Sequence, residues 1–188
     1  MRNARPVPAA FTALMLVVLA PRLAAQPAAT AAPPHRFDIV RTVLQSPRCL
    51  NCHVSGDFPR QGDERRPHDF GVRRGEGGHG VAAMRCATCH TDRNNGAFPG
   101  APHWGLAPRS QSWEGLDAAS LCQTLKDRRL NGRRSIEQLL THMSDDPLVA
   151  WAWAPGGSRA PVPVARDEFV KGIQAWAEAG APCPERRP

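Results

Sequence analysis

The sequence predicts a mostly α fold with long irregular loops. Apolar residues recur at helical spacing near residue 40 and through the second half of the chain, whereas residues 54–85 are rich in Gly, Arg and Pro and poor in apolar side chains. We find no convincing β-strand of any length. The 188 residues suffice for one domain, but this composition predicts a small apolar core. Another component is therefore expected to help hold the fold together.

The first 25 residues are typical of a secretory signal peptide. Arg2 and Arg5 precede an apolar run that ends at Ala20, and Leu23-Ala24-Ala25 then ends on small residues. The apolar run is too short to span a bilayer. The alternative is an uncleaved N-terminal anchor, the one case in which we expect membrane contact. In both cases the remainder of the chain is exported, and we expect it in the periplasm.

A linker and the first part of the folded domain follow this leader. Residues 26–34 are a low-complexity stretch of Gln, Pro, Ala and Thr that predicts a disordered linker. The folded domain is expected over residues 35–188. Its first helix is predicted over 36–45, and Pro47 ends it just before the first Cys pair. The Gly-rich stretch at 54–85 is predicted to be a loop, and wrapping a cofactor is a good reason for a loop of that length.

Three further helices are predicted in the C-terminal half. Asp117 can cap the first of them, which Asn131-Gly132 would end. Ser135 begins the second with a capping box. The last helix is predicted over residues 166–179, with Gly180 as its C-cap.

The chain is basic, with a formal charge of +7, and loss of the signal peptide would remove three Arg and leave +4. The remaining Arg residues do not gather into one basic run. They are dispersed, as Arg60, Arg65, Arg66, Arg73, Arg74, Arg128, Arg129, Arg133 and Arg134 illustrate. This distribution favours a solvated surface that steers an acidic redox partner, and it argues against nucleic-acid binding.

Two Cys-x-x-Cys-His motifs, at residues 49–53 and 86–90, carry the chemistry. In such a motif the two thiols add across the vinyl groups of a haem, and the imidazole that follows binds the iron. This attachment takes place outside the cytoplasm, so the export signal and the motifs support each other. We predict two haem c groups. The covalent attachments are Cys49, Cys52, Cys86 and Cys89, and the proximal iron ligands are His53 and His90. The full expectation is thus a di-haem cytochrome c domain with cytochrome c-like helices packed around two covalent haems.

Two other readings of the four cysteines are open. Four thiolates could hold zinc in a structural module, although the spacing between the pairs is long for a zinc ribbon and the repeated His is then unexplained. A redox-active dithiol is the other alternative.

Cys122 and Cys183 are left over and do not form a Cys-x-x-Cys pair. In an oxidising compartment a disulfide between them is the simplest interpretation, and free thiols are the alternative. The disulfide would hold the last helix against the domain.

Several side chains could occupy the sixth coordination position of each haem iron. His68 and His103 lie in turn-rich segments that flank the attachment sites, and His142 lies on a helix face with apolar neighbours. All three are candidate distal ligands. With two His ligands on each iron, the haems would only pass electrons, as an electron carrier does. One open iron would instead allow a haem enzyme such as a peroxidase.

Beyond these motifs, the chain resembles a family of bacterial two-haem proteins labelled isoquinoline 1-oxidoreductase subunit. The likeness rests on both haem motifs and on Pro99-Gly100-Ala101-Pro102-His103-Trp104, Leu121-Cys122 through Asn131-Gly132, Leu148-Val149-Ala150-Trp151-Ala152-Trp153 and Gly180-Ala181-Pro182-Cys183-Pro184. The chain departs from the family at Gly105, where relatives often carry a His. The resemblance implies an electron-transfer subunit whose partner is a molybdenum-containing oxidoreductase.

Overall fold

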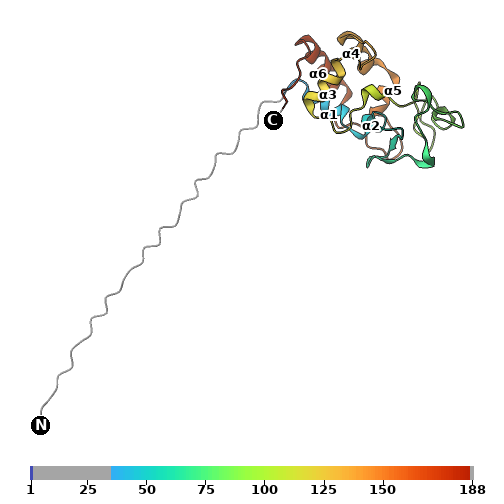
Figure 1. The fold of residues 1–188 in the computed structure, drawn as a ribbon, viewed down its shortest axis with the longest axis horizontal. Coiled ribbons are helices and arrows are strands. Elements are labelled where there is room, and N and C mark those ends of the chain that lie inside the picture. The colour runs from blue at the N-terminus through green and yellow to red at the C-terminus, as the bar shows by residue number, and fades with distance from the viewer. Residues whose placement is uncertain (2–34, 187–188) are drawn as a thin grey trace. The chain divides into compact units, whose positions relative to one another are not determined.

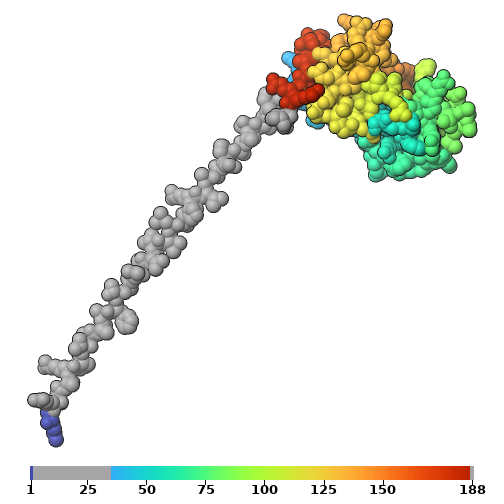
Figure 2. All heavy atoms as spheres, in the orientation of Figure 1, coloured from blue at the N-terminus to red at the C-terminus, as the bar shows by residue number. Residues whose placement is uncertain are grey.

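A computed structural model describes Met1 and residues 35–186. The expected signal peptide and linker lie outside the described residues. About 41% of the described chain is helical and 7% is strand, so helices and irregular loops dominate, as predicted. The α-helices gather in one part of the folded unit, and a region of loops coloured cyan to green forms the other (Figure 1). In the space-filling view, the residues coloured cyan to green lie together on one side of the folded unit (Figure 2).

Two helices lead into the first motif. α1 spans Asp38–Leu44, inside the predicted range, and buries Val40, Val43 and Leu44. Pro47 does more than end this helix, because it is the first residue of a short second one, α2 (Pro47–Leu50). The fixed φ of proline suits that position. Cys49 therefore lies on a helical turn.

The predicted loop at 54–85 contains two minimal hairpins. Strands β1 (Arg60–Gln61) and β2 (Arg66–Pro67) pair antiparallel, as do β3 (Gly80–Val81) and β4 (Met84–Arg85). Each strand has two residues, so the hairpins are tight turns in a loop and do not make a sheet that could form a core. Short 3-10 helices lie within and after the loop, namely η1 (Asp69–Gly71), η2 (Glu76–Gly78), η3 (Cys86–Thr88) and η4 (Arg109–Gln111).

The C-terminal helices begin where their caps predict. The carboxylate of Asp117 accepts a hydrogen bond from the Ser120 N–H at 2.6 Å, and Ser135 forms the capping box. The elements are α3 (Ala118–Lys126), α4 (Ile136–Asp145), α5 (Pro147–Ala150), η5 (Trp151–Trp153) and α6 (Arg166–Glu178). Helix α3 ends before Asn131, whose side-chain amide instead donates to the Leu125 carbonyl at 2.7 Å. Helix α6 has Ala179 as its C-cap, and Gly180 follows at a φ of +84°.

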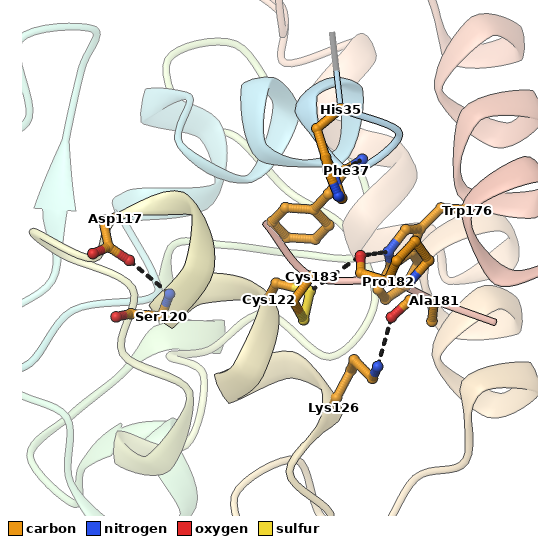
Figure 3. The surroundings of a disulfide bond; sticks show 10 residues. All are labelled: His35, Phe37, Asp117, Ser120, Cys122, Lys126, Trp176, Ala181, Pro182 and Cys183. Carbon is orange, nitrogen blue, oxygen red and sulfur yellow. Dashed lines mark hydrogen bonds between the residues drawn. A yellow bond between two sulfur atoms is a disulfide. The ribbon is translucent and has the colours of Figure 1, made fainter. Parts of the chain in front are cut away.

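The core lies between α1, α3, α4 and α6. The rings of Phe37 and Trp176 pack with centres 5.5 Å apart, and Trp176 is fully buried. Cys122 and Cys183 form the predicted disulfide, which joins α3 to the segment after α6 (Figure 3). The Trp176 indole N–H also donates to the Pro182 carbonyl at 2.8 Å. The C-terminal segment is thus held against the helices as expected.

The loop region contributes almost nothing to this core. All residues of the main apolar cluster lie at positions 37–50 or 113–183. Polar contacts hold the loops instead, and Arg74 is central among them, with its guanidinium donating to the carbonyls of Val54, Gly56 and Ala107. Within residues 35–186, no helix has the length and apolar character needed to cross a membrane.

Candidate haem-binding sites

The first motif begins on α2 and continues as a turn. The His53 N–H donates to the Cys49 carbonyl at 3.0 Å, and this bond keeps the motif compact. The His53 carbonyl in turn accepts from the Trp113 N–H at 3.1 Å. The segment before α3 is thereby joined to the motif.

The imidazole of His53 is held on two sides. Its Nδ1 lies 2.7 Å from the Gln111 carbonyl oxygen, and its ring stacks on Trp113 with centres 3.3 Å apart and planes 12° apart. A carbonyl oxygen only accepts hydrogen bonds, so Nδ1 carries the proton and Nε2 keeps its lone pair. A metal-binding histidine usually donates a hydrogen bond from the ring nitrogen that does not bind the metal, as Nδ1 of His53 does here.

Burial keeps His53 neutral. Desolvation lowers the pKa of His53 to about 3, against a raising effect of the Gln111 carbonyl and with smaller lowering effects from His142 and Arg74. The neutral ring is the form that binds a metal ion.

The second motif repeats this geometry in the loop region. Cys86 begins η3, and the Nδ1 of His90 lies 2.7 Å from the Pro99 carbonyl oxygen. The His90 ring stacks on Trp104 with centres 4.6 Å apart and planes 8° apart. Burial lowers the pKa of His90 as well. Both motifs therefore present a neutral imidazole with its proton on Nδ1, although only His90 lines the cavity described next.

The second motif opens into a cavity of about 770 Å³. That volume is within the range of about 300–1,000 Å³ common for cofactor sites. Cys52 of the first motif lines the same cavity as Cys86, Cys89 and His90. The two motifs are therefore neighbours in space.

The cavity wall has the donors that a haem would need for its carboxylates. Its cationic lining residues are Arg48, Arg60, Arg66, Arg73, Arg85 and Arg159. The Arg48 side chain is 2% exposed and pairs with Asp63, yet its Nε has no hydrogen-bond partner among the described residues. A buried donor of this kind normally has a partner. The apolar lining includes Phe70, Met84 and Phe98, which are exposed here, and a flat macrocycle between apolar and cationic groups fits this set.

The three candidate distal ligands lie in different surroundings. His68 lines the cavity, and its ring centre is 6.0 Å from that of His90. His142 is on α4, where its Nδ1 lies 3.1 Å from a carboxylate oxygen of Asp146, and it is close enough to His53 to lower the pKa of that residue. His103 is exposed at a φ of +62° and does not line the cavity.

The thiols of the first motif differ from those of a redox-active dithiol. Cys49, Cys52, Cys86 and Cys89 are not in disulfides. Burial raises the pKa of Cys49 to about 12 and, with a smaller contribution from Cys86, that of Cys52 to about 11. Reactive thiols have a lowered pKa. Among residues 35–186, no three or more His, Cys, Asp or Glu side chains gather in an arrangement that could hold a metal ion between them.

Sequence reasoning missed the groups that orient the two imidazoles. The carbonyls of Gln111 and Pro99 belong to the backbone, so no residue type signals them. Trp104 and Trp113 carry a weak signal, since each lies in a segment of Pro and Gly where a large aromatic ring needs a packing partner. Their stacking on the motif histidines depends on tertiary contacts.

In comparisons with known proteins, no family model, no curated protein and no solved structure matches the chain.

Proposed function

We propose that this chain is an exported c-type cytochrome with two covalently attached haems, which passes single electrons between redox partner proteins. The observation that carries the proposal is the repeated geometry of the motifs. In each, the histidine after the second cysteine has Nδ1 at 2.7 Å from a backbone carbonyl and its ring against an indole. Neither a zinc ribbon nor a redox-active dithiol requires a histidine directly after the second cysteine.

Haem iron supplies the chemistry, because it alternates between the ferric and ferrous states by taking up and releasing one electron. The residues of the chain bind and orient it. The four motif thiols would attach the two macrocycles, and His53 and His90 would bind iron through Nε2. Arg48, buried in the cavity wall, would donate to a haem carboxylate.

Several features support export and a protein partner. The Cys122–Cys183 disulfide suits an oxidising compartment such as the periplasm. The arginines around the cavity suit an acidic partner surface. The family resemblance adds a molybdenum-containing oxidoreductase as the proposed partner.

Haem content tests the proposal. The mature protein, produced with a periplasmic cytochrome c maturation system, should show two covalently bound haems per chain in pyridine haemochrome spectra. Replacing Cys49 and Cys52 by Ala, or Cys86 and Cys89 by Ala, should leave one haem each. The matched control is Cys122→Ala with Cys183→Ala, which removes two cysteines outside the motifs and should retain both haems. A protein that binds zinc through these cysteines and no haem would overturn the proposal.

A further inference from the structure

We infer that His68 is the distal ligand of the haem attached at Cys86 and Cys89, opposite His90. The inference rests on the proposed function, and it selects one side chain among several histidines. Two relations carry it. The first is the separation of the His68 and His90 rings, and the second is the hydrogen bonding of each ring.

The ring separation matches two imidazoles on one metal ion. A metal–imidazole bond is about 2.0–2.1 Å long, so two rings on opposite sides of one ion hold their Nε2 atoms about 4 Å apart and their centres about 6 Å apart. The centres of His68 and His90 are 6.0 Å apart. The planes of the rings differ by 73°, an angle that axial ligation leaves free. Both rings line the same cavity.

The hydrogen bonds leave the required nitrogen available on each ring. The Nδ1 of His68 lies 2.8 Å from the Asp69 carbonyl oxygen, and that of His90 lies 2.7 Å from the Pro99 carbonyl oxygen. Because carbonyl oxygens accept hydrogen bonds, both rings carry the proton on Nδ1 and a lone pair on Nε2. Neither ring needs to change its tautomer to bind iron.

The loop around His68 holds it in place. The hairpin of β1 and β2 ends directly before it, and the His68 N–H donates to the Pro59 carbonyl at 3.2 Å. The next residue, Asp69, accepts from Arg66 at 2.6 Å and from the Gln61 side-chain amide at 2.8 Å. Ligands held by such contacts bind with little rearrangement.

Other side chains suit this position less well. His103 is exposed and does not line the cavity. His79 also has its Nδ1 against a carbonyl oxygen, that of Trp104 at 3.2 Å, but it does not line the cavity. Met84 lines the cavity but precedes Cys86 by two residues, which is too near to reach across the same haem. With His68 bound, this haem has no open position and only transfers electrons.

The test compares His68→Ala with His103→Ala in the mature two-haem protein. In wild type we expect the haem at Cys86 and Cys89 to be low-spin when ferric and not to bind carbon monoxide when ferrous. His68→Ala should turn one of the two haems high-spin and add one carbon monoxide site per chain. Added imidazole should restore the low-spin state. His103→Ala should change neither property.

A second variant keeps the test decisive if His68→Ala does not fold. His68→Met supplies a thioether, which raises the potential of a haem, so one of the two midpoint potentials should rise while both haems stay low-spin. Unchanged spin state and potentials in both His68 variants would overturn this inference and leave the two-haem proposal intact. A wild-type protein without covalent haem would overturn the proposed function itself.

Discussion

The His53 imidazole lies flat against the Trp113 indole, with ring centres 3.3 Å apart, while its Nδ1 is 2.7 Å from the Gln111 carbonyl oxygen. Trp113 also donates its indole N–H to the Gln111 side-chain oxygen at 3.1 Å. One buried tryptophan therefore packs against His53, the proposed iron ligand. The same tryptophan holds the side chain of Gln111, whose backbone carbonyl accepts a hydrogen bond from His53.

The first prediction concerns this tryptophan. Trp113→Ala should lower the free energy of unfolding by about 3–5 kcal/mol, because it removes a buried ring and leaves a cavity. Trp113→Phe keeps a flat ring against His53 but leaves the Gln111 oxygen without a donor, which costs about 1–3 kcal/mol. Urea denaturation of the purified protein followed by circular dichroism measures both. Equal losses in the two variants would mean that the ring stacking contributes nothing.

The second prediction concerns the Cys122–Cys183 disulfide, which closes a loop with a sequence separation of 61 (Figure 3). Replacing both cysteines by Ala should lower the free energy of unfolding by about 4 kcal/mol, because the unfolded chain loses a long cross-link. Cys122 is fully buried, so part of the loss reflects packing. Wild type treated with a reductant serves as the comparison, and it should lose most of the same stability. A reduced wild type as stable as the oxidised protein would contradict the prediction.

The third prediction uses the carboxylate of Glu114, which accepts from Ser55 and pairs with Arg65 at 2.6 Å. Burial raises the pKa of Glu114, but these donors outweigh it and hold the pKa below the ordinary value of 4.5. The folded state therefore binds its proton less readily than the unfolded state does. The stabilisation is complete above about pH 4.5 and is lost as the pH falls through the folded-state pKa.

Glu114→Gln should thus cost about 1–3 kcal/mol at pH 7, and the difference from wild type should shrink below pH 4.5. Urea denaturation at several pH values measures this difference. Glu178→Gln, at the exposed end of α6, is the matched control and should behave as wild type does. A difference that stays constant down to pH 3 would exclude the charge of Glu114 as its cause.

The fourth prediction compares two glycines with nearly the same φ. Gly71 has a φ of +60° and open space where a Cβ would lie, whereas a Cβ on Gly75, at +61°, would lie 2.0 Å from the Gly80 carbonyl oxygen. Gly71→Ala should cost about 1 kcal/mol for the left-handed conformation. Gly75→Ala should cost a further ~1–3 kcal/mol, because the loop must open and because the ψ of −171° at Gly75 lies in a backbone region that side chains other than glycine's disfavour. Thermal unfolding of the two variants measures the difference, and equal melting temperatures would show that neither the close approach nor the backbone conformation of Gly75 carries an added cost.

Much of the helical part of the fold could be predicted because its signals are local. Asp117 and Ser135 begin helices since their side chains reach amide groups only three residues away. The C-terminal end of α3 is predicted less accurately. The helix ends at Lys126, and Asn131 is not its C-cap but donates a side-chain hydrogen bond to the Leu125 carbonyl. The minimal hairpins were missed, since strands of two residues have no periodicity to detect.

The sequence by itself determined the two Cys-x-x-Cys-His motifs, because the reach between two thiols and the following imidazole is a property of consecutive residues. It also left a pair of cysteines for a disulfide, and the structure confirms that bond. Only the tertiary structure decided what surrounds each imidazole. Trp113 reaches His53, and His68 reaches His90, through contacts between segments far apart in the chain. Such contacts depend on the packing of whole loops, which no spacing in the sequence encodes.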